Sequence, residues 1–273
     1  MYLTFLGTNT LFITNGTSSL LIDPHFSRPG LCKLLWKTKP DKAKIRSGLK
    51  KLNVTTLDGI LLTHTHYDHA MDAVEVAHQT SSVIYGSKSA TNLAKGGGLS
   101  QDKFQVVIPM EQINIGAFRV TFLDADHISF PLPLGLFMPD KGRISQPLTP
   151  PLYFWRYQSG SVFAILIENL LVLGSAGLMP NPFPKIDVKT VVLSVGGLET
   201  KPIRYLEKLY QQTVLQTGAQ QVMLSHWDNF FRPISRDVQT LGLGSLTIQR
   251  IMRLGKLHGQ EVKVLVPGER IEI

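Results

Sequence analysis

Cysteine, charge and long apolar runs are all scarce in this sequence. Its one cysteine, Cys32, excludes an internal disulfide framework and is typical of a reducing compartment. Charged residues make up 18% of the chain and hydrophobic residues 43%, a balance that excludes an intrinsically disordered chain. The apolar stretch Val162–Leu173 is interrupted by Glu168 and Asn169 and is too short to span a bilayer. We therefore expect a globular protein with a well-filled core.

Acidic residues are also few, because 20 Asp and Glu stand against 28 Lys and Arg and leave a formal net charge of +8. Much of the excess lies between Lys33 and Lys51, where Asp41 is the only acidic residue. One interpretation is a solvated basic helix, and the other is a rim that attracts an anionic substrate or a membrane surface. We expect a small anionic substrate, with membrane or lipid contact and a homo-oligomer left open. No nucleic acid is expected, since no nucleic-acid-binding motif accompanies the charge.

The order of expected elements indicates one domain over residues 1–273. Short strands come first, then alternating strands and helices, then strands and again alternating units, and no linker rich in Pro, Gly and Ser divides them. This order predicts two sheets with helices outside, an α/β four-layer αβ/βα sandwich. The stretch Pro131–Pro151 contains six prolines and is expected to be a long loop. The opening residues lack a basic segment and a cleavage site, so a cytoplasmic location is expected.

The segment Thr63–His69 is exceptional in composition. It contains three of the eight histidines together with Asp68, and it follows the apolar residues Gly59–Leu62 directly. Packed imidazoles compete for hydrogen-bond partners and repel one another when charged, whereas a divalent metal takes neutral imidazole nitrogen and carboxylate oxygen as ligands. The sequence therefore predicts a metal site at the end of a strand. A helix over Ala70–His78, capped by Asp68, is expected to follow.

The pattern His64-x-His66-x-Asp68-His69 resembles the signature of the metallo-β-lactamase superfamily, and the order of elements is similar over essentially the whole chain. The resemblance implies two metal sites, one served by the first two histidines and the other by the adjacent Asp-His pair. Later strand ends would complete both sites. The full set of metal ligands that the resemblance implies is His64, His66, Asp68, His69, His127 and His226.

One position departs from the pattern of the superfamily. Ser175 stands after the strand Leu170–Leu173, where the family usually has an aspartate that bridges two metals. A neutral hydroxyl bridges two cations poorly, because it brings no charge to offset their repulsion. Either the site holds one metal, or a bridging hydroxide joins two, or Asp126 or Asp228 replaces the missing carboxylate. We expect a second metal that is bound more weakly than usual.

Three further residues match or adjoin positions that surround the ligands in the superfamily. Asp23 ends the strand Ser18–Ile22 and corresponds to an aspartate that orients ligand histidines through their far nitrogens. His25 follows it closely and is a candidate for substrate contact. Asp228, beside His226, is a candidate for either role.

The implied activity is hydrolysis. A metal-bound hydroxide would attack a small anionic ester, lactone or phosphodiester, with Asp68 as the catalytic carboxylate and Zn, in one or two ions, as the cofactor; Mn and Fe are alternatives. Three segments resemble the branch that contains L-ascorbate-6-phosphate lactonase and N-acyl-phosphatidylethanolamine phospholipase D: Phe5–Thr8, Leu21–Pro24 and His226–Asp228. A degenerate, non-catalytic metal- or ligand-binding member, favoured by Ser175, and an RNA-processing nuclease, favoured by the basic surface, stay open.

Overall fold

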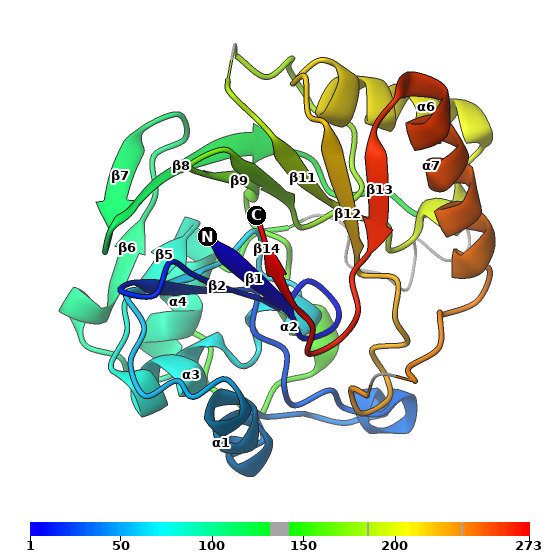
Figure 1. Ribbon diagram of the computed structural model, residues 1–273. Helices are drawn as coiled ribbons and strands as arrows, with labels where there is room; N and C mark the ends of the chain where they lie inside the picture. The colour runs from blue at the N-terminus through cyan, green and yellow to red at the C-terminus, as the bar shows by residue number, and fades with distance from the viewer. Residues whose placement is uncertain (132–141, 185, 236) are drawn as a thin grey trace.

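Two seven-stranded sheets face one another in the computed structural model, which describes residues 1–131, 142–184, 186–235 and 237–273 (Figure 1). The strands of the first sheet are, in spatial order, β14 (Arg270–Glu272), β1 (Tyr2–Phe5), β2 (Leu11–Thr14), β3 (Ser19–Ile22), β4 (Gly59–Leu61), β5 (Ile84–Gly86) and β6 (Phe104–Val106). Those of the second are β13 (Glu261–Val264), β12 (Gln221–Ser225), β11 (Thr190–Ser194), β10 (Leu170–Leu173), β9 (Val162–Ile167), β8 (Phe118–Ala125) and β7 (Gln112–Ile115).

Helices cover the outer face of each sheet, which confirms the predicted four-layer α/β sandwich (Figure 1). The helices on the first sheet are α1 (Lys42–Lys51), α2 (Tyr67–Ala70), α3 (Ala73–Thr80) and α4 (Lys88–Gly96). Those on the second are α6 (Ile203–Tyr210), which a π-helical turn over Gln211–Leu215 continues, and α7 (Gly244–His258). Shorter 3-10 turns are η1 (Leu31–Leu35), η2 (Gln101–Lys103), η3 (Phe154–Arg156) and η4 (Leu198–Thr200). Among the described residues, no helix is both long and apolar enough to cross a membrane.

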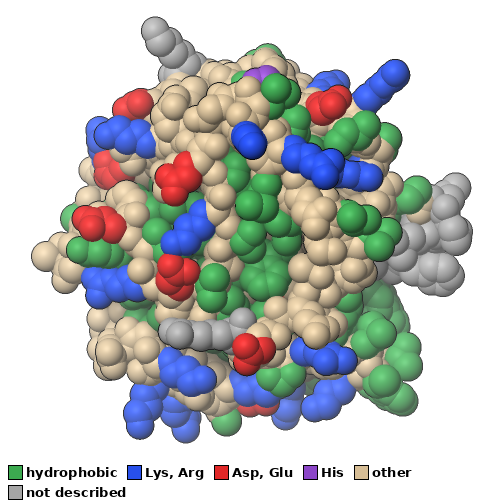
Figure 2. Space-filling model, turned by 45° about the vertical axis from the view of Figure 1, so that its right-hand side comes forward, with side chains coloured by type: hydrophobic (Ala, Val, Ile, Leu, Met, Phe, Trp, Pro, Cys, Tyr) green, Lys and Arg blue, Asp and Glu red, His purple; other side chains and the backbone are tan. Residues whose placement is uncertain are grey.

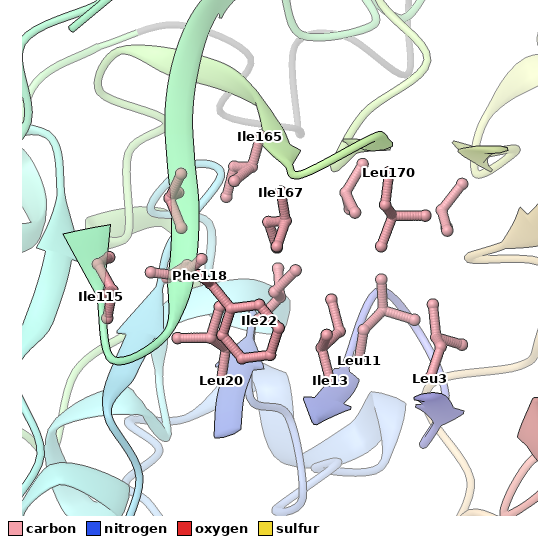
Figure 3. Packing of buried hydrophobic residues seen from close by; sticks show 14 of the residues in the cluster. Leu3, Leu11, Ile13, Leu20, Ile22, Ile115, Phe118, Ile165, Ile167 and Leu170 are labelled. Carbon is pink, nitrogen blue, oxygen red and sulfur yellow. The ribbon is translucent and has the colours of Figure 1, made fainter. Parts of the chain in front are cut away.

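The core lies between the two sheets. Leu20 and Ile22 of β3 point toward the second sheet, from which Ile165 and Ile167 of β9 point back (Figure 3). The central strands β4, β10 and β11 are buried along their whole length, because helices cover one face and the opposite sheet covers the other. Each such side chain contributes about 1.5–3 kcal/mol when it is fully buried. This packing holds the strand ends of both sheets at one edge of the sandwich.

The predicted helix over Ala70–His78 differs from the structure. α2 begins one residue before Asp68, so Asp68 lies inside the first turn and is not the cap, and a second helix, α3, starts after Asp72. The break coincides with a long-range contact, because the Asp72 carboxylate accepts hydrogen bonds from the backbone and hydroxyl of Ser27, at 2.6 Å each. Local periodicity carries no information about such a contact, and the prediction was wrong for that reason.

Three further segments show what the sequence alone does not decide. α7 starts at Gly244, because the residues before it run beside Asp228 and Asn229 and pair with them. β14 was not predicted, since its three residues bury only Ile271 and depend on pairing with β1. Residues 132–141 of the expected loop Pro131–Pro151 lie outside the described residues, and residues 142–151 form no helix or strand.

Candidate metal centre

The sequence-predicted ligands meet where strands of both sheets end. From the first sheet, β3 leads to Asp23, and β4 leads to the histidine run and α2. From the second sheet, β8 leads to His127, β10 to Ser175 and β12 to His226. Strand ends of facing sheets approach one another at this edge, so residues far apart in the sequence become neighbours.

Six side chains form two adjacent triads. His64, His66 and His127 are the first triad, and Asp68, His69 and His226 are the second; within each triad, one ligand atom per residue lies within 4.8 Å of the others. The rings of His64 and His69 lie 3.9 Å apart, centroid to centroid, so the triads adjoin. In the second triad, Asp68 Oδ2 lies 3.6 Å from His69 Nε2 and 3.3 Å from His226 Nε2.

The first triad fits a divalent metal. The Nε2 atom of His64 is buried without a hydrogen-bond partner among the described residues, a costly state that a metal would relieve. His127 donates from Nδ1 to its neighbour's carbonyl, Ile128 O, at 2.8 Å, which leaves Nε2 as the donor atom for a metal. Burial lowers the pKa of both His64 and His127 well below the usual value, so both are in the neutral form that binds metals.

The second triad is supported from behind by Asp23. This carboxylate is fully buried and accepts hydrogen bonds from Thr63 N and His69 Nδ1, both at 2.8 Å, so His69 presents Nε2 to Asp68. Burial lowers the pKa of His69, but the carboxylates of Asp68 and Asp23 outweigh it and raise the pKa overall. Burial raises the pKa of Asp68, but His69 and His226 outweigh it and leave this pKa far below its usual value. The second triad therefore carries an ionised carboxylate.

Ser175 lies in the cavity beside the triads, and neither proposed substitute carboxylate belongs to a triad. The Ser175 hydroxyl accepts the backbone N–H of Ile128 at 3.1 Å. Asp126 is exposed and lines a neighbouring, open depression. Asp228 is buried and engaged, since Oδ2 lies 2.6 Å from Arg28 Nη2 and Oδ1 accepts the backbone N–H of Thr8 at 2.7 Å. Neither Asp126 nor Asp228 therefore replaces the bridging aspartate.

His25 lies beside the second triad but does not line the cavity. Its ring meets the Tyr67 ring edge-on at 5.8 Å, and both of its nitrogens are buried without a partner among the described residues. Burial lowers the pKa of His25 to about 3, so the ring is neutral. Tyr67 and Asp68 line the cavity at this point, whereas His25 does not. The substrate contact expected for His25 stays a prediction.

A cavity of about 370 Å³ opens above the triads. All of the second triad and two residues of the first line its floor, while its walls are mostly aromatic and aliphatic: Leu31, Phe130, Phe154, Tyr157, Phe230 and Phe231. Among the described lining residues there is no Lys or Arg. The net positive charge of the chain therefore does not come from the residues that line the cavity.

The sequence reasoning missed Ser194 and Gly196 in the lining of the cavity. Ser194 ends β11 and is fully buried, with no hydrogen-bond partner among the described residues for its hydroxyl, and the hydroxyl of Tyr157 is in the same state. Gly196 is required for space, because a Cβ atom there would lie 2.7 Å from His226 Nδ1. The signal for Ser194 and Gly196 was their position at the end of an apolar strand, where the sequence also places the candidate metal ligands.

Comparison with known proteins decides the family. The model of the metallo-beta-lactamase superfamily matches residues 3–152, which include the whole histidine run. The chain belongs to the metallo-beta-lactamase superfamily. A metal-dependent hydrolase named UPF0173 from Roseiflexus sp. is 30% identical over 138 residues, which are 50% of this chain and 52% of that protein. One from Christiangramia forsetii is 36% identical over 92 residues, or 34% of each chain. The matches thus span about half the length of these relatives or less.

Solved structures share the fold over the full length of the chain. The metallo hydrolase Igni18 of Ignicoccus hospitalis is 17% identical, with a TM-score of 0.60, over 100% of this chain and 98% of its own. An isothiocyanate hydrolase from Delia radicum gut bacteria is 16% identical, with a TM-score of 0.57, over 100% of this chain and 99% of its own. At such low identity these structures support the superfamily fold and say nothing about the substrate of this member.

Proposed function

We propose that this chain is a metal-dependent hydrolase that cleaves an ester, a lactone or a phosphodiester. The observation that supports the proposal most strongly is the pair of adjacent triads on the floor of a cavity, with neutral imidazoles in one triad and an ionised carboxylate in the other. The names of the UPF0173 relatives agree with it.

The two triads divide the work of holding metal. His64, His66 and His127 would hold the first ion, and Asp68, His69 and His226 the second. A divalent ion with an open position lowers the pKa of water and polarises the oxygen of the group under attack. Zn is proposed, in one or two ions, with Mn and Fe as alternatives because all three accept this donor set. Asp23 keeps His69 in the tautomer that presents Nε2.

The reaction needs a group that accepts the proton of the attacking water, and Asp68 is the candidate. Its carboxylate is ionised and lines the cavity floor. After the attack, the same carboxylate can pass the proton to the leaving oxygen. Burial raises the pKa of Tyr157, so its phenol keeps its proton and can donate to a substrate oxygen from the cavity wall.

The cavity favours a substrate with an apolar substituent. Its described walls are mostly apolar and contain no Lys or Arg. Burying an unpaired anion among such side chains would be costly, so a negative charge on the substrate would lie either against the metal triads on the floor, as in a phosphodiester, or toward the mouth. The anionic substrate expected from the sequence therefore stays a proposal, with its charged part placed outside the apolar walls.

Removal and return of metal test the proposal. The purified chain would be treated with a chelator and assayed on p-nitrophenyl esters, a simple lactone and bis-p-nitrophenyl phosphate before and after Zn, Mn or Fe is added. We expect turnover of at least one substrate that depends on metal. His66→Ala should lower turnover by about a hundredfold or more, while His258→Ala, an exposed histidine outside both triads, should not.

An absence of turnover is interpreted together with the metal content of the chain. If the chain carried a full load of metal and hydrolysed none of these substrates, the proposal would be wrong and the non-catalytic metal- or ligand-binding alternative would replace it. If His258→Ala reduced turnover as strongly as His66→Ala, the loss would come from the fold rather than from the triads.

A further inference from the structure

Large apolar side chains are exposed on the 3-10 turn η1 and just after it. Leu31, Leu35 and Trp36 are 62%, 68% and 65% exposed, and Leu34 is the one hydrophobic side chain of the turn that is buried. Three such neighbours in one turn form an apolar patch rather than the scattered single residues that every protein surface carries. The turn therefore presents an apolar surface whose exposure to water is unfavourable.

Aromatic residues of η3 extend this patch. Thr38 and Leu152 pair as an isolated antiparallel bridge through two backbone hydrogen bonds of 2.7 and 2.8 Å, which holds the segments after η1 and before η3 side by side. Tyr153 and Trp155 stack with centroids 4.4 Å apart, and Trp155 is 45% exposed. Trp and Tyr in this amphipathic setting are typical of membrane–water interfaces.

The charge of the two segments is of one sign. Lys33, Lys37, Lys39 and Arg156 are exposed, and Lys37 Nζ lies 5.7 Å from the centre of the Tyr153 ring. No Asp or Glu occurs in residues 24–40 or 145–160. Figure 2, which brings the right-hand side of Figure 1 forward, shows exposed hydrophobic side chains at the lower right and Lys and Arg side chains along the lower edge.

The same surface borders the mouth of the metal cavity. Leu31 is exposed and also lines the cavity, and Phe154, between the two stacked aromatic residues, lines it as well. A substrate that enters beside η1 therefore passes the exposed apolar and basic side chains first.

We propose that the surface formed by η1, residues 36–39 and η3 docks on a membrane that contains anionic phospholipid. Leu31, Leu35 and Trp36 would enter the headgroup region, and the lysines would pair with lipid phosphates, as in other interfacial anchors. Two copies of this chain would meet with like charges if they used the same surface, which disfavours a symmetric dimer there. One consequence rests on the proposed hydrolase activity: the mouth of the metal cavity would face the bilayer, and an acyl chain of the substrate would lie between the apolar walls.

Vesicle sedimentation tests the docking separately from catalysis. The metal-loaded chain would be mixed with vesicles of phosphatidylcholine alone or with about one third phosphatidylglycerol, at about 0.1 M and about 0.5 M salt. We expect retention on the anionic vesicles that falls at high salt, and at least tenfold weaker binding to the neutral ones. A Lys33→Gln, Lys37→Gln, Lys39→Gln triple variant should weaken binding about a hundredfold, since each lysine near the surface contributes about fivefold.

Matched variants separate the patch from general changes in charge and hydrophobicity. Leu35→Ser with Trp36→Ser should weaken binding at least tenfold, whereas Leu257→Ser, an exposed leucine on α7, should not. The charge control is a Lys88→Gln, Lys208→Gln, Lys256→Gln triple variant at exposed lysines elsewhere. Circular dichroism and metal content should be equal in all variants.

Three results would overturn the docking proposal. The first is no retention on anionic vesicles by the folded wild-type chain, and the second is an equal loss in both triple variants. The third is that Trp36→Ser abolishes self-association or the binding of a single-stranded RNA oligonucleotide while vesicle binding is unchanged. Hydrolysis of soluble esters by the same preparations reports on the proposed function independently, so failure of one proposal is distinguishable from failure of the other.

Discussion

The two halves of the metal centre are built from different kinds of sequence and are held in place in different ways. The first sheet supplies four candidate ligands from one loop, and hydrogen bonds to the Asp23 and Asp72 carboxylates hold that loop from behind. The second sheet supplies His127 and His226 from two separate strand ends, and contacts with distant segments place His226: its N–H donates to Thr8 O at 2.6 Å, and the adjoining Asp228 pairs with Arg28. One half is a local motif, and the other half depends on sheet packing.

Asp228→Asn should break the second half most severely. Asp228 and Arg28 form a buried ion pair that joins the loop after β12 to the loop between β1 and β2 through Thr8. Loss of the carboxylate leaves the buried guanidinium without its counter-charge, so we expect the free energy of unfolding to fall by about 3–5 kcal/mol. Urea denaturation measures it. Glu168→Gln, in the exposed pair with Arg119, is the control and should change stability little. If both variants lost the same stability, burial of the Arg28–Asp228 pair would not be the reason for the loss.

Asp23→Asn should weaken the second metal and spare the first. The amide would lose the charge that holds His69 Nδ1–H, and an outer partner of this kind contributes about 10- to 100-fold to metal affinity. Metal titration of the chelated chain measures the two affinities. Asp58→Asn, at an exposed position away from the triads, provides the control. A uniform loss at both sites, accompanied by a lower unfolding midpoint, would show that Asp23 acts on the fold rather than on one triad.

Ser175→Asp should restore a bridge between the halves. A carboxylate at this position offsets the repulsion between two cations, so we expect metal content to rise toward two ions per chain, from a lower value in the wild type. Elemental analysis of protein purified without added metal measures it. Ser175→Ala removes only the hydroxyl that accepts the Ile128 N–H and should leave metal content unchanged. Two tightly bound ions in the wild-type chain would refute the weak second site.

Asp72→Asn should change the pH dependence of stability. Burial raises the pKa of Asp72 to about 7, above its value of about 3.8 in the unfolded chain. Between these values the folded state binds more protons, so the contribution of Asp72 to stability is present below about pH 4 and is lost as pH rises to 7. The stability of the variant relative to the wild type should therefore increase with pH over this window. Thermal unfolding at several pH values measures it, and exposed Asp124→Asn should show no trend.

Prediction from the sequence succeeded where information was local. The expected strands Ser18–Ile22 and Leu170–Leu173 correspond to β3 and β10, and the histidine run follows the strand β4 as expected. It failed where a distant contact decided the outcome: Asp72 bonds to Ser27 instead of continuing a helix, and β14 exists because β1 offers it a free edge. Asp228 was a candidate to replace the bridging carboxylate, and only the structure shows that it pairs with Arg28 while it also lines the cavity.

The sequence by itself determined that a metal site follows β4, because the density of His and Asp in Thr63–His69 has no other physical explanation. Through the resemblance to the superfamily, it also predicted that Ser175 stands where an aspartate is usual, and this stays a prediction. Only the tertiary structure decided the lining of the cavity, since Leu31, Phe154 and Phe230 come from three loops whose spacing along the chain predicts no contact. A ligand motif depends on spacing within one loop, whereas the walls of a cavity depend on how whole layers pack.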